Sequence, residues 1–290
     1  MSTIESLVLS SPQGILVNNP VQAAGVARGI LQQICEKKRS EVAQQKKDMP
    51  LDYLQNFYDL TGHQTISFKR ALLRSPSGII AEFKRRSPSK GWIHPDANVK
   101  AVTSAYEQAG AAALSILTDE SYFGGTFHDF KRARKVVRGI PILRKDFIVD
   151  EYQVHQSKVL GADVILLIAA CLTKDEVSRF AGIAHELGLE VLLEIHNENE
   201  LEYITDVIDV VGVNNRDLTS FVTDIEVSLK LSDKIPAHFV KISESGLSDI
   251  ETVKKLRRAG YQGFLMGENF MKMSESGKAL KEFIQSLEKL

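Results

Sequence analysis

The chain has 290 residues, of which 43% are hydrophobic and 25% are charged, and its formal net charge is -1 at pH 7. This length and composition are ordinary for a globular protein and suffice for one large domain or two small ones. The near-neutral charge gives no bulk attraction to nucleic acid or to an anionic membrane. We therefore expect neither as a partner, and any anion has to be bound locally.

The expected absence of a targeting signal and the use of cysteine both fit a reducing compartment. The longest apolar run, Val164–Leu172, is about half as long as a membrane-spanning helix needs. The first 27 residues contain no lysine or arginine, so the basic region of a signal peptide is missing. Neither the number nor the spacing of Cys35 and Cys171 suggests a metal site or a disulfide framework, and Cys171 reads as a small core residue. We predict a cytoplasmic protein.

The N-terminal part divides into two segments. We interpret residues 1–29 as a flexible tail, because small and polar residues are interspersed through most of it. From Ile30 to about Lys47, apolar residues recur at helical spacing, which predicts an amphipathic helix whose lysines form a solvated face. Shorter helical pieces follow. We expect this extension, residues 30–75, to lie across the rest of a single domain that spans residues 30–290.

From Gly78 onward, short apolar runs alternate with longer helical patterns. The runs predict eight strands, at Ile79–Phe83, Ala113–Leu117, Pro141–Leu143, Val164–Ile168, Glu190–Glu194, Val210–Val213, Phe239–Ile242 and Gly263–Met266. The helices expected between and after them are Lys100–Ala109, Phe127–Val137, Glu151–Leu160, Lys174–Leu187, Glu198–Thr205, Asp224–Leu231, Asp249–Ala259 and Lys278–Leu287. Eight such units predict a closed (β/α)8 TIM barrel with an additional N-terminal helical segment. An open doubly wound sheet is the alternative, disfavoured because no G-x-G-x-x-G follows the first strand.

Ionisable residues gather where several predicted strands end. In a barrel of this kind the C-terminal strand ends meet at one face, which carries the active site. Three glutamates and two lysines converge there: Glu82, Lys84, Lys145, Glu194 and Glu244. Buried charges must be paired, so a structural ion pair remains an alternative for each residue alone. The whole set is better explained as a source of both an acid and a base near neutral pH.

Two further groups of residues suggest a phosphate site and an apolar wall. S-E-S-G-L and M-G-E-N-F follow the last two strands, and their small residues let backbone N–H groups point inward, as at phosphate sites in such barrels. Ser87 and Lys84 would close this site from the first strand. An apolar shelf would lie beside the charges, although core packing is the alternative for each of its members: Phe123, Phe147, Leu166 and Leu218.

Together these residues resemble the indole-3-glycerol-phosphate synthase family of the tryptophan pathway. The motifs that carry the resemblance are A-E-F-K-R-R-S-P-S-K-G, L-T-D-E-S-Y-F-G-G, P-I-L-R-K-D-F-I-V, L-L-E-I-H, G-V-N-N-R-D-L and S-E-S-G. It covers Ile30 to the C-terminus and includes the family's extra N-terminal helix. It implies a carboxy-lyase that converts 1-(2-carboxyphenylamino)-1-deoxyribulose 5-phosphate to indole-3-glycerol phosphate, releasing carbon dioxide and water, without a metal or organic cofactor.

The resemblance also implies a role for each matching position. Lys145 would protonate the substrate carbonyl during ring closure, and Glu194 would be the acid/base partner in the dehydration. Lys84 would contact the anthranilate carboxylate, and Glu82 would orient the catalytic lysine. The remaining implied substrate contacts are Asn214 and Glu244 at the ribulose-derived chain, Arg216 near the carboxylate, and Ser87, Ser245, Gly246, Gly267 and Glu268 at the phosphate. The expected partner is this phosphorylated small molecule, and the expected state is a monomer or weak homodimer.

One position departs from the family pattern, and two other functions stay open. The last strand is followed by G-E-N-F-M, so Asn269 and Phe270 stand where a small residue and leucine are common in the family. A sugar-phosphate isomerase on the same barrel would use a cysteine/aspartate pair at strand ends, but Lys145 and Glu194 occupy those positions here. A non-catalytic phosphometabolite sensor would not need five aligned ionisable groups.

Overall fold

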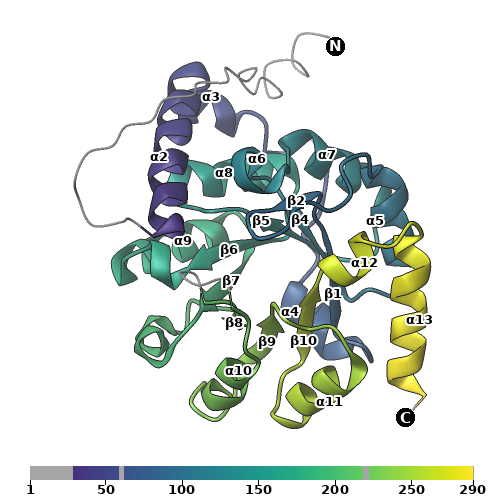
Figure 1. The fold of residues 1–290 in the computed structure, drawn as a ribbon. Coiled ribbons are helices and arrows are strands. Elements are labelled where there is room, and N and C mark those ends of the chain that lie inside the picture. Colours follow the sequence, from purple (N-terminus) through teal and green to yellow (C-terminus); the bar gives the residue numbers. More distant parts are fainter. Residues whose placement is uncertain (1–28, 59–61, 218–221, 290) are drawn as a thin grey trace, which may run out of the picture.

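Eight parallel strands close into a barrel in the computed structural model, which describes residues 29–58, 62–217 and 222–289 (Figure 1). Around the barrel the strands follow the order β1-β10-β9-β8-β7-β6-β5-β4. Their bounds are β1 Ile79–Phe83, β4 Ala113–Leu117, β5 Ile142–Lys145, β6 Val164–Ile168, β7 Glu190–Ile195, β8 Val210–Asn214, β9 Val240–Glu244 and β10 Gly263–Met266. The predicted (β/α)8 barrel is therefore confirmed.

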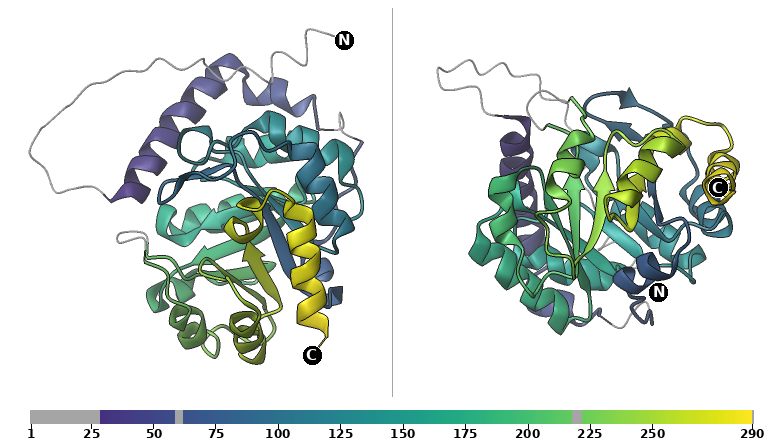
Figure 2. Two further views of the ribbon diagram at one scale, coloured as in Figure 1. Left: turned by 45° about the vertical axis from the view of Figure 1, so that its right-hand side comes forward. Right: turned by 90° about the horizontal axis from the view of Figure 1, so that it is seen from below.

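Helices surround the barrel on its outside, as the two turned views show (Figure 2). Those before and between the first strands are α2 Ile30–Asp48, α3 Leu51–Gln55, α4 Phe68–Arg74, α5 Val99–Gln108, α6 Glu120–Phe123, α7 Phe127–Val136 and α8 Glu151–Leu160. The later ones are η1 Ala169–Cys171, α9 Lys174–Glu186, η2 Glu198–Tyr203, α10 Glu226–Leu231, α11 Ile250–Arg258, α12 Glu268–Met271 and α13 Ser276–Glu288. A small hairpin of β2 Arg86–Ser87 and β3 Gly91–Trp92 follows β1. None of these helices, among the residues described, is long and apolar enough to cross a membrane.

Differences from the predicted elements lie at element ends, in one helix and in short elements that were not predicted, namely the β2–β3 hairpin, α6, η1 and α12. Strands β5, β8 and β9 end one or two residues later than predicted, so Lys145, Asn214 and Glu244 are the last residues of their strands. The helix predicted over Glu198–Thr205 is a shorter 3-10 helix, η2. Its side chains favour a tight turn, since Glu200 accepts the backbone N–H of His196 at 2.7 Å. Phe123 of the expected apolar shelf ends α6, a short helix that was not predicted.

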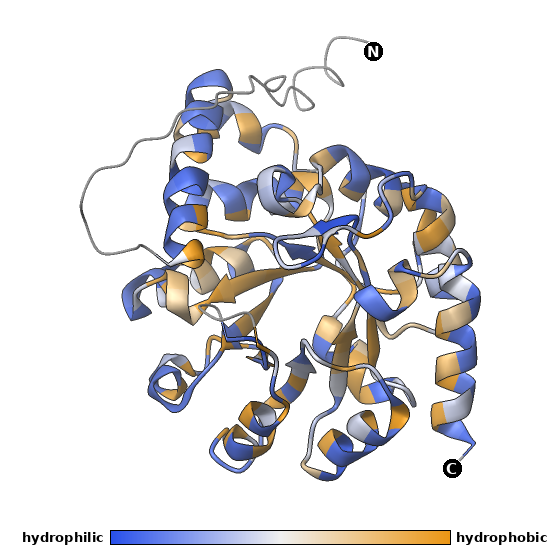
Figure 3. Ribbon diagram, viewed as in Figure 1, coloured by the Kyte–Doolittle hydropathy of each residue, from blue (hydrophilic) through white to orange (hydrophobic). Residues whose placement is uncertain are grey.

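Apolar residues occupy both faces of the strands and one face of most helices (Figure 3). All five residues of β1, β4 and β6 are buried, as expected for parallel strands between a barrel interior and a helical layer. The inner cluster includes Leu143, Leu166 and Leu192 from the strands. Phe68 and Leu72 of α4 belong to the same cluster, so the N-terminal extension contributes to the barrel core.

The long helix α2 packs against the outside of the barrel near α8. Val42 and Met49 share a buried cluster with Tyr152 and Val159 of α8. The Tyr152 hydroxyl also donates a hydrogen bond to the carbonyl oxygen of Met49 at 2.7 Å. These contacts are the docking expected for an amphipathic extension. The tail expected over residues 1–29 lies almost wholly outside the described residues.

Candidate functional site

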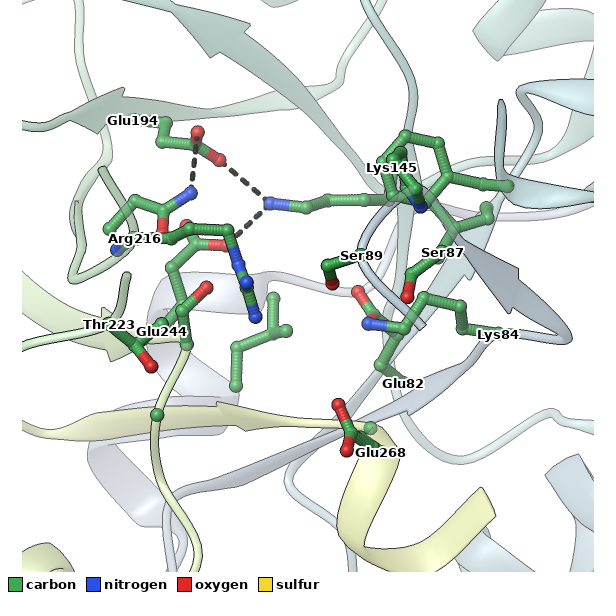
Figure 4. Close-up of a pocket in the computed structure, with 18 of the residues that line it drawn as sticks. Glu82, Lys84, Ser87, Ser89, Lys145, Glu194, Arg216, Thr223, Glu244 and Glu268 are labelled. Atoms are coloured by element: carbon green, nitrogen blue, oxygen red, sulfur yellow. Dashed lines mark hydrogen bonds and ion pairs between the residues drawn. The ribbon is translucent and has the colours of Figure 1, made fainter. Parts of the chain in front are cut away.

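A cavity of about 630 Å³ opens at the C-terminal ends of the barrel strands (Figure 4). Its walls contain every site residue predicted from the sequence except Leu218, which lies outside the described residues. The predicted residues that line it are Glu82, Lys84, Ser87, Phe123, Lys145, Phe147, Leu166, Glu194, Asn214, Arg216, Glu244, Ser245, Gly246, Gly267 and Glu268. Strand geometry explains this convergence, because side chains two residues apart on a strand point to the same face. Four of the ionisable residues follow an inward-facing core residue by two positions: Ile80 and Glu82, Leu143 and Lys145, Leu192 and Glu194, Ile242 and Glu244.

Lys145 is the centre of the charged cluster. Its Nζ lies 2.8 Å from Oε2 of Glu194 and 2.6 Å from Oε2 of Glu244. Asn214 donates from Nδ2 to the other oxygen of Glu194 at 3.0 Å. Three different strands thus supply one lysine and two carboxylates that contact each other inside the cavity (Figure 4).

The close packing of these charges shifts their pKa values in different directions. Burial alone would lower the pKa of Lys145, but the carboxylates of Glu194, Glu244 and Glu82 outweigh it and raise that pKa. Burial and the neighbouring Glu194 raise the pKa of Glu244 to about 7, although Lys145 opposes them. For Glu194, Lys145 and His196 overcome the effect of burial and hold its pKa well below the usual value. The site therefore holds an ammonium, an ionised carboxylate and a carboxyl group that titrates near neutral pH.

A second ion pair lies across the cavity from Glu194 (Figure 4). Lys84 Nζ is 2.6 Å from Oε1 of Glu82, whose other oxygen accepts a hydrogen bond from Ser115 at 3.4 Å. Gly267, at the end of β10, packs directly against this carboxylate. A Cβ atom there would lie 2.8 Å from Oε1 of Glu82, so only glycine leaves the pair in place.

The loops after β9 and β10 form one polar end of the cavity. Ser245 has φ 69°, the single positive-φ residue other than glycine among the residues described, and Gly246 follows with φ 73°. Asn269 donates from Nδ2 to the carbonyl oxygen of Ser248 at 2.8 Å and so ties the two loops together. The hydroxyl of Ser87 is buried at this cavity and has no hydrogen-bond partner within the described part of the chain. Buried polar atoms usually have partners, so this hydroxyl is available to a ligand.

An apolar wall stands beside the charges and includes residues that the sequence interpretation missed. The rings of Phe123 and Phe147 lie 5.9 Å apart between centroids. Ile30, Leu31 and Ile34 of α2 also line the cavity. Their helical spacing predicted an apolar face, but nothing in the sequence indicated that this face reaches the active-site end of the barrel.

Lys38 of α2 was predicted to lie on a solvated face, and this is wrong. Its side chain is buried, with Nζ 2.8 Å from Asp119 and 3.1 Å from Asp146. Asp119 caps α6, which carries Phe123, and Asp146 accepts the backbone N–H of Phe147 at 2.9 Å. Lys38 thus joins the N-terminal helix to α6 and to the loop after β5, which carry the two aromatic side chains.

Comparisons with known proteins agree with this geometry. A sequence profile of the family described as "Indole-3-glycerol phosphate synthase" matches residues 31–283. A protein of that name from Bacteroides thetaiotaomicron is 51% identical over 261 residues, which cover 90% of this chain and 100% of the relative. Its counterpart from Carboxydothermus hydrogenoformans is 40% identical over 259 residues, 87% of this chain and 98% of the relative.

Solved structures with low sequence identity support the fold alone. The 3-hexulose-6-phosphate synthase of Salmonella typhimurium has a TM-score of 0.59 at 12% identity, covering 73% of this chain and 99% of that chain. A chain of the tryptophan synthase complex from Pyrococcus furiosus has a TM-score of 0.54 at 16% identity. The match covers 74% of this chain and 99% of that chain. The family match over most of the chain, together with the cavity described above, establishes that the chain belongs to the indole-3-glycerol phosphate synthase family.

Proposed function

We propose that the chain catalyses the reaction that its family name describes, in tryptophan biosynthesis. It closes the indole ring of 1-(2-carboxyphenylamino)-1-deoxyribulose 5-phosphate, with loss of carbon dioxide and water. The observation that carries the proposal is the position of Lys145 Nζ between Glu194 and Glu244, in a cavity with a polar loop end and an aromatic wall. Each of these parts matches one chemical demand of the substrate.

Ring closure requires a proton at the carbonyl oxygen that becomes an alkoxide, and Lys145 is assigned to supply it. Its raised pKa keeps the amine protonated in the free enzyme. An alkoxide is more basic than an amine, so transfer of the proton becomes favourable as the carbon–carbon bond forms. Glu194, which is ionised, then serves as the acid/base partner in the dehydration, and Asn214 keeps its carboxylate oriented.

Substrate binding is assigned to the two ends of the cavity. The loops at Ser245, Gly246, Gly267 and Glu268 would hold the phosphate, chiefly through backbone N–H groups, with Ser87 adding its unpartnered hydroxyl. Phe123, Phe147 and Leu166 would cover the aromatic ring. Lys84 and Arg216 would contact the carboxylate until it leaves, and Glu82 and Glu244 would bind the chain that joins the two ends. Holding both ends keeps the chain folded for ring closure, which is a positioning effect.

The test is a fluorescence assay for indole formation after addition of the carboxyphenylamino substrate to protein treated with a chelator. We expect turnover without added metal. A binding signal without fluorescence growth would refute the lyase and favour a phosphometabolite sensor, whereas formation of a non-fluorescent isomerised sugar phosphate would favour an isomerase.

A further inference from the structure

His196 is a mostly buried histidine that has no role in the site as assigned above. It follows β7 and stands two residues after Glu194, so both side chains point toward the same side of the barrel. Its buried Nε2 lies 3.2 Å from Oε1 of Glu194, which is an ion-pair contact without hydrogen-bond geometry. On the other side of the ring, Nδ1 lies 3.3 Å from Oε2 of Glu200, and the same oxygen accepts the backbone N–H of His196 at 2.7 Å.

The surroundings of this pair leave the imidazole positively charged at neutral pH. Burial would lower the pKa of His196, but its contacts with Glu194 and Glu200 raise it to about 10. Among the residues described, the other charged or titratable groups close to Glu194 are Lys145 from β5, Glu244 from β9 and Cys171 from η1. Glu194 is therefore flanked by two cations, one on each oxygen.

These two cations differ in what happens to them during turnover. In the proposed reaction Lys145 gives its proton to the substrate and becomes a neutral amine. A buried carboxylate without a cation is costly, so Glu194 would then tend to take up a proton or turn away. His196 does not line the cavity, and it stays charged because Glu200 remains beside it.

We propose that His196, held by Glu200, is a positioning residue that keeps the carboxylate of Glu194 ionised and in one orientation while Lys145 loses its proton. This inference rests on the proposed function. It assigns a role to the last residue of the L-L-E-I-H motif and to a carboxylate on η2 that does not line the cavity.

The first test is the pH profile of His196→Gln, which removes the positive charge but keeps a hydrogen-bonding amide. We expect kcat to fall by about tenfold or more while KM changes by less than about threefold, because the residue acts through Glu194 and not on the substrate. Without the imidazolium the pKa of Glu194 rises, so the acidic limb of the kcat profile moves to higher pH. His185→Gln is the matched control, since His185 forms a comparable pair with Asp209 on the outside of the barrel. It should change neither kcat nor the profile.

Glu200→Gln removes the negative charge beside the imidazole ring while His196 itself stays in place, so it tests the role of Glu200. The pKa of His196 should fall toward its ordinary value, so kcat should decline at a pH where the wild-type chain is still fully active. Restoring the carboxylate as Glu200→Asp should recover part of this loss. Unchanged profiles for His196→Gln and Glu200→Gln in folded protein would overturn the proposal.

An NMR titration of the histidine rings separates this inference from the proposed function, because it needs no turnover. We expect His196 to remain an imidazolium at about pH 8 in the wild type and to titrate at lower pH in Glu194→Gln. A neutral ring at pH 8 would overturn the inference whatever the enzyme catalyses. Absence of turnover with an imidazolium present would refute the proposed function alone.

An independent observation concerns Cys35 and Cys171, which are 136 residues apart in sequence. Their Sγ atoms lie 3.0 Å from each other, where α2 meets η1. A disulfide needs about 2.05 Å, so a small movement would allow the bond. Both side chains, with Arg39, line a surface hollow of about 400 Å³, in which Cys35 is buried and Cys171 is partly exposed. The contact with Cys171, and to a smaller extent Arg39, lowers the pKa of Cys35 despite its burial, whereas the contact with Cys35 and burial raise the pKa of Cys171. Cys35 is therefore the thiol that more readily forms the reactive thiolate.

We infer that Cys35 and Cys171 form a reversible disulfide with a low-molecular-weight disulfide, such as oxidised glutathione, as the oxidant. One protein thiolate attacks the oxidant and releases its first thiolate. The other protein thiolate then attacks the protein sulfur of this mixed disulfide, forms the Cys35–Cys171 bond and releases the remaining thiolate of the oxidant. Two electrons thus pass from the protein to the oxidant. Such a bond would fasten α2, whose Ile30, Leu31 and Ile34 line the active-site cavity, to the barrel.

Mass spectrometry after alkylation tests this bond directly. Protein equilibrated with oxidised glutathione should carry the intramolecular disulfide. It should also melt at a higher temperature, because the bond constrains the unfolded chain. Dithiothreitol should restore both the two free thiols and the original melting temperature. Cys171→Ser should form no internal bond and show no change in melting temperature. Two free thiols, or glutathione adducts alone, in the treated wild type would overturn the inference.

Discussion

Replacing Lys145 with methionine removes the central ammonium while keeping a flexible apolar side chain in its place. If Lys145 is the proton donor, kcat should fall by about 10² to 10⁴, the range expected for loss of a general acid. KM should change by less than about tenfold, because the polar loops and the aromatic wall, to which we assign substrate binding, remain. Fluorescence growth under saturating substrate measures kcat, and a substrate titration measures KM.

The same substitution leaves Glu194 and Glu244 buried without the cation that they share. Removing one partner of a buried ion pair costs about 3–5 kcal/mol in the free energy of unfolding. The loss should depend on pH. The pKa of Glu244 is already about 7, raised by burial and Glu194, and without Lys145 it rises further. A carboxyl group with a raised folded-state pKa loses stability as pH increases from its unfolded value toward the folded one. Urea unfolding should therefore show a larger loss at about pH 8.5 than at about pH 5.5.

A double variant separates the catalytic effect from the stability effect. Adding Glu244→Gln to Lys145→Met removes the second negative charge, and Glu194 keeps its contacts with Asn214 and His196. Most of the lost stability at high pH should return while kcat stays low. Retained turnover in Lys145→Met would refute its assignment as proton donor. A stability loss of equal size at both pH values would refute the charge argument.

Three further predictions concern the walls of the cavity and the buried lysine of α2 that supports them. Ser245→Asp should raise KM by about tenfold or more and leave kcat nearly unchanged, because the new negative charge lies beside the assigned phosphate site. Steady-state kinetics of the variant and the wild type measure both constants. Gly267→Ala places a Cβ atom against Glu82, so it should lower both kcat/KM and the free energy of unfolding, the latter by about 1–3 kcal/mol in urea. Lys38→Met should cost about 3–5 kcal/mol because its ion pairs are buried, whereas Lys46→Met, in an exposed pair on the same helix, should cost at most about 1 kcal/mol. Equal losses for the two lysine variants would contradict the assignment of Lys38 as a buried connector.

The positions of the charged residues could be predicted because the barrel imposes them. A strand of known length and burial has a known end, and parallel strands that close a barrel bring these ends to one face. Glu82 and Glu194 needed no further information. The two-residue period of the strands also places Lys145 and Glu244 inward even though the predicted ends of their strands were short.

Contacts between distant elements could not be predicted in the same way. The helical period of α2 gives its apolar face, but the position of the helix along the barrel depends on side chains of α8 far along the chain. Lys38 therefore looked like any solvated lysine until its two aspartates were in place. The approach of Cys35 to Cys171 follows from the same docking and leaves no trace in their spacing.

The charge balance of the cavity separates binding from catalysis. Three carboxylates, Glu82, Glu194 and Glu244, contact three cationic side chains, Lys84, Lys145 and His196. A proton can move among these six groups without changing their total charge, which limits the electrostatic cost of the transfers that the reaction needs. For the same reason the cluster offers little net attraction to an anionic substrate. Affinity must then come from the loops around Ser245 and Gly267 and from the aromatic wall. Substitutions in those regions should act mainly on KM, whereas substitutions of Lys145, Glu194 and His196 should act mainly on kcat.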